Sequence, residues 1–209
     1  MFQKILVLSP HTDDGELGCG GTVSRFVGEG KHVTYAALSC CEKSVPPEYP
    51  RDILRTEVKK ATGILGIKKE DLILCDYEVR VFPENRQKIL DTLIDIRKRV
   101  KPDLVFTPSS FDTHQDHITV MKETLRAYKM CTILGYEQPW NNITFNTLSF
   151  IPLKEKHIKT KIAALKSYQT QKHRKYLNEE FIKGLAHTRG TQIEEEYAEA
   201  FEVIRWVYR

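Results

Sequence analysis

The segment KILVLSPHTDDGELGCGGT, residues 4–22, decides the fold that we predict for this chain. It begins with an apolar run, residues 4–8, that is typical of a buried strand, and it ends in a glycine-rich stretch that opens a helix. A strand that passes directly into a helix is the building unit of parallel α/β sheets. Ligands of such sheets bind beyond the carboxyl ends of the strands, and His11, Asp13 and Asp14 stand at that point.

Strand and helix patterns continue to alternate along the chain. We expect further strands at 32–38, 72–77 and 104–107, helices at 53–65, 86–100 and 117–129, weaker strands at 132–138 and 144–153, and a helical final third at 155–209. This alternation favours an α/β, Rossmann-like fold with a mostly parallel sheet flanked by helices. Because no linker or repeat divides the chain, residues 1–209 are predicted to form one domain.

The composition is that of a globular protein with a mild charge. Hydrophobic residues make up 41% of the 209 positions, and the formal net charge is +4. Lys and Arg are interspersed with Asp and Glu, which argues against a nucleic-acid partner. The densest basic stretch, residues 166–175, is expected to be a solvated helix face and turn, and its alternative is a site for an anionic substrate or a polar carrier.

The cysteines and the apolar runs bear on the compartment. The five cysteines form no CxxC pair, which is typical of proteins from a reducing environment. The N-terminus shows no signal-peptide pattern, and no apolar run approaches the roughly 20 residues that cross a bilayer. We therefore predict a cytoplasmic protein without a membrane span.

The first polar cluster, His11, Asp13 and Asp14, suits a metal site. Two adjacent carboxylates on a turn point in different directions, so that one can bind a metal while the other faces water. Their mutual repulsion would be costly without a cation nearby. The alternative is a polar turn in which Asp13 or Asp14 caps the following helix.

The glycines of this segment also resemble a dinucleotide-binding fingerprint. Gly18-Cys19-Gly20-Gly21 follows the first strand, and Glu42 lies where a ribose-binding acid would stand. However, polar residues separate the strand from these glycines, and Val23 occupies the third glycine position. We therefore expect the glycines to let the helix pack closely against the sheet.

The second polar cluster is His114-Gln115-Asp116-His117, which follows the strand expected at 104–107. Both clusters stand at the carboxyl ends of predicted parallel strands, so they are expected to converge on one divalent ion at that edge of the sheet. His117 is expected to bind the metal and His114 to meet the reacting carbonyl. Asp116 can accept a hydrogen bond from one imidazole nitrogen. The alternative is a polar surface loop.

These residues resemble the zinc-dependent, LmbE-like N-deacetylases that act on N-acetylglucosamine-type sugars, including the phosphatidylinositol-glycan, mycothiol and bacillithiol pathway enzymes. The opening signature of that family stands here as residues 10–14, PHTDD, followed by residues 18–22, GCGGT. The second signature stands as residues 114–117, HQDH, with Asp112 two positions before it. Weaker matches extend the resemblance over essentially the whole chain.

The resemblance implies a role for each residue of the two clusters. The metal ligands would be His11, Asp14 and His117, holding Zn²⁺, with Fe²⁺ or another divalent ion as alternatives. Asp13 would be the general base, and His114, oriented by Asp116, would stabilise the oxyanion or protonate the leaving amine. The substrate-binding residues would be Arg55 and Asp112.

The function implied is hydrolysis of the acetyl group from an N-acetylated amino sugar or sugar conjugate, with release of acetate. Two alternatives stay open: another metallohydrolase, such as a phosphoesterase, and a non-catalytic sugar- or nucleotide-binding module. The segments 40–51 and 136–146, the latter with Trp140, and the connection after Tyr77 are expected to shape the pocket. Relatives of this family often form rings or dimers, so a homo-oligomer is a further expectation.

Overall fold

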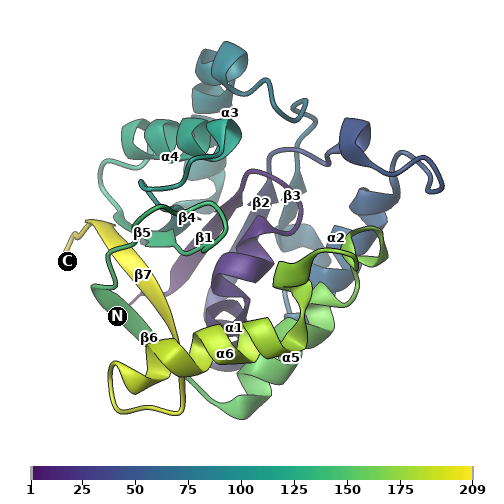
Figure 1. The fold of residues 1–209 in the computed structure, drawn as a ribbon. Helices are drawn as coiled ribbons and strands as arrows, with labels where there is room; N and C mark the ends of the chain where they lie inside the picture. The colour runs from purple at the N-terminus through teal and green to yellow at the C-terminus, as the bar shows by residue number, and fades with distance from the viewer. Residues whose placement is uncertain (1, 209) are drawn as a thin grey trace.

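A central sheet organises the computed structural model, which describes residues 2–208 (Figure 1). Within these residues the sheet has seven strands in the order β3-β2-β1-β4-β5-β7-β6. The strands are β1 (Lys4–Ser9), β2 (His32–Ala37), β3 (Leu72–Leu74), β4 (Leu104–Pro108), β5 (Thr132–Tyr136), β6 (Ser149–Leu153) and β7 (Tyr197–Arg205). Strands β1 to β5 pair in parallel, whereas β7 pairs antiparallel with both β5 and β6. The predicted α/β class with a mostly parallel sheet is confirmed.

Helices cover both faces of this sheet. They are α1 (Asp14–Gly28), α2 (Ile53–Ile64), α3 (Arg86–Val100), α4 (Gln115–Ala127), α5 (Glu155–Leu165) and α6 (Glu179–Thr191). Alternate residues of β1 point to opposite faces, as the period of a strand requires. Ile5 and Val7 belong to the core beneath α1, α2 and α5, while Leu6 and Leu8 belong to the core beneath α3 and α4 (Figure 1).

Two glycines let α1 lie directly against the sheet. A Cβ atom at Gly15 would overlap the ring of Tyr35, and one at Gly18 would overlap the ring of Tyr136. The expectation that this stretch serves close packing is therefore confirmed. The same helix kinks at Cys19, whose φ of −145° is not helical.

The final third of the chain is not all helical, and here the prediction was wrong. Strand β7 lies between β5 and β6, although its first residues, Tyr197 to Ala200, are compatible with a helix. Backbone pairing on both sides of the strand outweighs this local preference. Two smaller differences concern bounds: β3 ends at Leu74, and α4 begins at Gln115.

Buried charges tie β7 to the rest of the fold. The Glu199 carboxylate accepts hydrogen bonds from the backbone N–H groups of Gly21 (3.0 Å) and Thr22 (2.7 Å) on α1 and from Lys161 Nζ (2.7 Å). Farther along β7, Glu202 Oε2 accepts hydrogen bonds from the Ser109 hydroxyl and the Ser110 N–H after β4, both at 2.8 Å. Strand β7 is thus hydrogen-bonded to α1, which follows β1, and to the turn that follows β4.

The buried Lys161–Glu199 pair provides a stability prediction with an internal control. We expect Lys161→Met to lower the free energy of unfolding by about 3 kcal/mol, because it leaves a buried carboxylate without its counter-charge. Lys159→Met on the same helix removes the solvent-exposed pair with Glu155, and we expect a loss within about 0.5 kcal/mol. Urea unfolding of both variants measures the difference, and equal losses would contradict the assignment of Lys161 as a buried anchor.

None of the helices within residues 2–208 has the length and apolar character required of a membrane span.

Candidate metal centre

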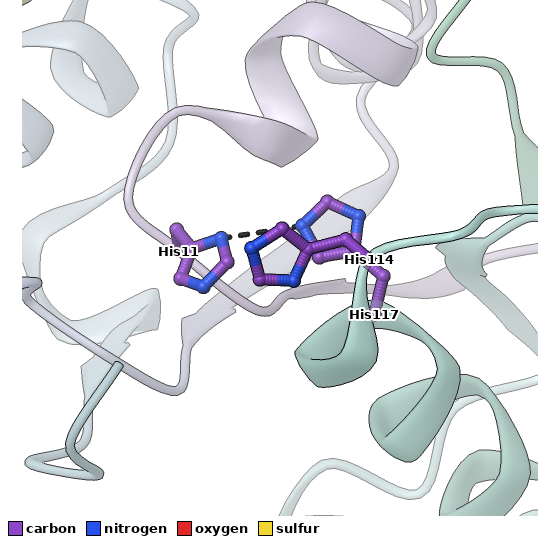
Figure 2. A group of neighbouring side chains, drawn as sticks. All are labelled: His11, His114 and His117. Carbon is purple, nitrogen blue, oxygen red and sulfur yellow. Dashed lines mark hydrogen bonds between the residues drawn. The ribbon is translucent and has the colours of Figure 1, made fainter. Parts of the chain in front are cut away.

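The two polar clusters meet at the carboxyl edge of β1 and β4. These strands are parallel neighbours, with Val7 opposite Phe106, so the segments that follow them emerge side by side. His11 lies in the turn between β1 and α1, whereas His114 and His117 stand at the start of α4. Figure 2 shows the three imidazoles facing one another across this edge. The predicted convergence of the two clusters is what the structure shows.

Three donor atoms of the predicted ligands form a nearly equilateral triangle. His11 Nδ1 and His117 Nε2 are each 3.1 Å from Asp14 Oδ2, and the two nitrogens are 3.2 Å apart. Tetrahedral zinc binds nitrogen and oxygen ligands at about 2.0–2.2 Å, which places neighbouring donors about 3.3–3.5 Å apart. The residues therefore fit one face of a tetrahedral metal site.

Each of the two imidazoles of the triangle is held through its other ring nitrogen. Asp116 Oδ2 lies 3.0 Å from His11 Nε2, and Asp112 Oδ2 lies 2.8 Å from His117 Nδ1. Carboxylate partners of this kind fix the tautomer and the ring orientation of metal-binding histidines. They turn His11 Nδ1 and His117 Nε2 toward Asp14, which is the arrangement that a shared ion needs.

Asp14 is held by neighbours of its own. Its Oδ2 accepts the backbone N–H of His11 at 2.8 Å, and its Oδ1 accepts Gln138 Nε2 at 2.9 Å. Gln138 comes just after β5 and escaped the sequence analysis, because a single glutamine after a strand carries no signal of its own. Its contribution is visible only once β5 lies beside β4.

The electrostatics of the cluster favour a positive charge at the triangle. Burial opposes ionisation of Asp14, but His117 and His11 outweigh it and hold the pKa of the carboxyl well below its usual value. Burial also opposes the imidazolium of His117, yet Asp14 and Asp112 raise its pKa to about 10. The carboxylates thus stabilise a cation at this position, whether a proton or a divalent ion.

Asp13 stands beside the triangle, and its side chain makes no hydrogen bond to another residue between positions 2 and 208. It occupies the N-cap position of α1 without making a capping hydrogen bond, so the capping alternative is not supported for this side chain. Burial and then the charge of Asp14 raise the pKa of Asp13 to about 6. A carboxylate that no other residue engages by a side-chain hydrogen bond, next to the donor triangle and on a cavity wall, is placed to handle a proton.

His114 faces the same cavity from the opposite segment. Its ring centroid lies 4.9 Å from that of His11 and 4.7 Å from that of His117. Its Nδ1 accepts the backbone N–H of Asp116 at 3.1 Å, so the proton of the neutral ring lies on Nε2. Burial, followed by the neighbouring imidazoles of His117 and His11, lowers the pKa of His114. The side chain is therefore suited to donate a hydrogen bond.

The structure differs from the expectation for Asp116. Its carboxylate was expected to orient His114, but it binds His11 and also accepts the backbone N–H groups of Arg80 (2.6 Å) and Phe82 (3.3 Å). The reason is the start of α4: His114 is its N-cap, folded over the first turn, while the Asp116 side chain points toward residues 80–82. Asp116 bonds to His114 through its backbone N–H and not through its carboxylate.

The two residues expected to bind substrate are engaged elsewhere. Asp112, whose side chain is 1% exposed, accepts hydrogen bonds from His117 and, at 2.8 Å, from the backbone N–H of His114. Arg55 pairs with Glu42 at 3.0 Å and with Asp76, and it lines a separate cavity. Asp112 thus positions His117, and Arg55 belongs to an ion-pair cluster outside the histidine cavity.

A buried acid supports the turn from below. The Glu16 carboxyl, fully buried, accepts hydrogen bonds from the hydroxyls of Tyr35 and Tyr168, and burial raises its pKa to about 8 despite both bonds. Each hydroxyl also lies within hydrogen-bond distance of the carbonyl oxygen of Thr12. This network holds residues 12–16, and sequence analysis missed it because its members come from three distant elements.

The histidines open into a cavity of about 310 Å³. All three segments expected to shape the pocket contribute to its walls, through Cys41, Arg80 and Trp140. A fourth segment, 171–176, also lines the cavity; it overlaps the basic stretch 166–175, for which an anionic-substrate site was only the alternative. Trp140 stacks on Tyr176 of that segment, with ring centroids 4.1 Å apart and an angle of 14°, so one face of the indole serves packing.

Comparison with known proteins agrees with this geometry. The "Uncharacterized deacetylase YaiS" of Escherichia coli is 28% identical over 170 residues, which is 79% of this chain and 90% of that protein. The "Diacetylchitobiose deacetylase" of Thermococcus kodakarensis is 28% identical over 123 residues, or 55% of this chain. The chain spans 45% of the length of that second relative.

Solved structures share the fold at lower identity. The N,N'-diacetylchitobiose deacetylase of Pyrococcus horikoshii superposes with a TM-score of 0.81 at 21% identity, over 97% of this chain and 84% of that one. GalB, the 4-carboxy-2-hydroxymuconate hydratase of Pseudomonas putida KT2440, superposes with a TM-score of 0.80 at 20% identity, over 99% and 98%. The same fold therefore accommodates different reactions, and the fold alone does not assign one.

The family comparison is more specific than the fold. The model of the PIG-L family, described as "GlcNAc-PI de-N-acetylase", matches residues 6–128, which include both polar clusters. Because the match covers more than half of the 209 residues, the chain belongs to the PIG-L family of N-deacetylases.

Proposed function

We propose that this chain is a zinc-dependent hydrolase that removes the acetyl group from an N-acetylated amino sugar and releases acetate. The observation that carries the proposal is the donor triangle of His11, Asp14 and His117, with Asp13 on one side and His114 on the other. Membership of the PIG-L family and the sugar deacetylases among the relatives supply the reaction class. The substrate would be a free or conjugated amino sugar of a size that the cavity admits.

The triangle is the place for the metal. His11 Nδ1, Asp14 Oδ2 and His117 Nε2 would hold the ion, and such a nitrogen and oxygen set suits zinc as well as Fe²⁺ and related divalent ions. When bound, the ion supplies a Lewis acid that polarises the amide carbonyl and lowers the pKa of water from about 15.7 toward 7.

Asp13 and His114 would handle the protons and the developing charge. Asp13 accepts a proton as water attacks the amide carbon, and the Nε2–H of His114 donates a hydrogen bond to the carbonyl oxygen as negative charge builds on it. The carbon–nitrogen bond then breaks as the nitrogen takes a proton from Asp13 or His114, so acetate and the free amine are released. Asp112 and Asp116 keep the ligand imidazoles in their working tautomers.

Asp112 could either orient His117 or contact the substrate, and the two roles predict different effects of its substitution. We expect Asp112→Asn to weaken metal affinity by about 10–100-fold, because His117 loses the carboxylate that orients it. A substrate contact would instead raise KM at saturating metal and leave metal affinity unchanged. Competition for the metal against a chelator of known affinity, followed by KM measured with excess metal, separates the two.

The direct test of the function combines metal analysis with product analysis. We expect a gently purified protein to carry close to one divalent ion and to release acetate from N-acetylglucosaminides, with activity lost on chelation and restored by zinc. Phosphate release from phosphate esters without acetate release would instead identify a phosphoesterase. Sugar binding without any stoichiometric metal would identify a binding module.

A further inference from the structure

Two arginines line the histidine cavity without a carboxylate partner. Arg80 follows β3, and Arg174 lies between the short helices η4 (Gln169–Gln171) and η5 (Lys175–Leu177). Within residues 2–208 neither guanidinium belongs to an ion pair, and Arg174 Nε only approaches Gln171 Oε1 at 3.4 Å. Both charges are therefore available to a ligand.

The cations that line two other cavities are paired with carboxylates. Arg55 pairs with Glu42 and Asp76, Lys43 pairs with Glu78 at 2.6 Å, and Arg189 pairs with Glu137 at 3.0 Å. The acids on the cavity wall are Asp13 and Asp14, which the proposed function assigns to the base and to the metal. The wall thus carries two unmatched positive charges beside the reaction site.

The backbone at Arg80 shows that its position is fixed. Its φ of 72° lies in the left-handed region, which glycine adopts without strain and arginine does not. Its N–H donates to Asp116 Oδ2 at 2.6 Å, and its carbonyl oxygen accepts the side-chain amide of Gln115. The carboxylate that holds His11 therefore also holds the backbone of Arg80, from which the exposed side chain extends along the cavity wall.

The basic stretch 166–175 contributes only one of its cations to the cavity. Lys166 pairs with Glu179 at 3.0 Å on the surface, and Lys172, His173 and Lys175 are absent from the cavity wall. Most of the stretch is thus the solvated surface that the sequence predicted. Arg174 is exposed as well, but it also lines the cavity, which is the position that the alternative of an anionic-substrate site requires.

We propose that the substrate carries an oxyanion group, a carboxylate or a phosphate, which Arg80 and Arg174 bind at the wall of the cavity while the acetamide group meets the metal triangle. The planar guanidinium group matches both oxyanions and forms charge-assisted, bidentate hydrogen bonds to them. This inference rests on the proposed function and narrows its substrate class to acidic amino-sugar conjugates.

The test compares one neutral and two acidic substrates. We measure kcat/KM for acetate release from methyl, carboxymethyl and 1-phosphate derivatives of N-acetylglucosamine. The better of the two acidic compounds is expected to exceed the methyl glycoside by about tenfold or more, and it identifies the preferred oxyanion. Arg80→Gln and Arg174→Gln are each expected to lower this acidic-to-neutral ratio by about threefold, and the double variant to bring it close to one.

Two further variants separate charge recognition from folding. Lys172→Gln removes an exposed cation of the same stretch and is expected to keep the ratio unchanged. Arg80→Gly relieves the left-handed strain, so it is expected to fold at least as well as the parent chain and still to lose the preference. The ratio also cancels any shared effect on the metal site. An acidic-to-neutral ratio near one in the parent chain would overturn the inference while leaving the deacetylase proposal intact.

Binding measurements distinguish failure of the inference from failure of the function. If none of the three compounds releases acetate with zinc present, the proposed function fails. Calorimetry with glucosamine 1-phosphate, carboxymethyl glucosaminide and methyl glucosaminide then decides the inference. Tighter binding of an acidic compound that disappears in the double arginine variant supports the oxyanion site, and equal binding of all three refutes it.

Discussion

Asp13→Asn is expected to keep a full equivalent of metal and to hydrolyse the acetamido substrate about 10²–10⁴-fold more slowly, which is the usual contribution of a general base. Asp13 is not a vertex of the donor triangle, so an amide at this position leaves all three metal-binding atoms in place. It makes no capping hydrogen bond, so the start of α1 loses nothing. Metal content and kcat, measured on the same preparation, check both parts of the prediction.

Asp52 offers a matched control for this substitution. It is the N-cap residue of α2, and like Asp13 it makes no side-chain capping hydrogen bond, but it is exposed and absent from the cavity wall. Asp52→Asn is expected to leave kcat unchanged. If Asp13→Asn also turned over at the parental rate, the assignment of Asp13 as base would be wrong. If it lost the metal instead, Asp13 would be a ligand.

His117→Ala is expected to abolish both metal retention and hydrolysis, because it removes one vertex of the triangle. The remaining donors, His11 Nδ1 and Asp14 Oδ2, are 3.1 Å apart and form a two-ligand site that cannot compete with a chelator. The substitution also leaves Asp112 buried without its imidazole partner. Metal analysis after dialysis against a mild chelator measures the loss.

His32 is the control for a histidine substitution. It lies at the start of β2, half exposed and paired with Asp71 at 2.9 Å, at the opposite end of the strand from the metal site. His32→Gln is expected to retain metal and activity. If His117→Ala retained stoichiometric metal, His117 would not be a metal ligand. If its activity returned with excess zinc, His117 would contribute less to metal affinity than we assign.

The sequence predicted what short local patterns encode. Ile5 to Leu8 form a buried strand because each side chain is apolar, and His11 to Asp14 follow it within one turn, so strand and ligand position could be derived together. The same holds for β4 and the pair His114 and His117. Two such units on neighbouring parallel strands suffice to predict their convergence.

Partners that come from distant segments could not be predicted in this way. Asp116 was matched with His114, its neighbour in sequence, but it binds His11, 105 positions away. The local sequence around residues 80–82 does not indicate that the N–H groups of Arg80 and Phe82 also bind the Asp116 carboxylate. The resemblance to a family indicated which groups are expected to react, but only the fold shows which carboxylate binds which histidine.

Strand β7 was missed for a related physical reason. Its residues carry no strong local preference for a strand, and its state is decided by pairing with β5 and β6 and by what Glu199 and Glu202 reach. In the sequence alone, a glutamate on a buried strand cannot be distinguished from a glutamate on the surface, because its hydrogen-bond partners are not known. Long-range hydrogen bonds, rather than periodicity, determine this part of the fold.

That insertion also makes the candidate metal-binding edge depend on a remote part of the chain. Residues 197–205 lie between β5 and β6, and their buried acids accept hydrogen bonds from α1, which follows β1, and from the turn after β4. The segments that carry the two histidine clusters are therefore joined by a strand that contributes no donor atom to the candidate site.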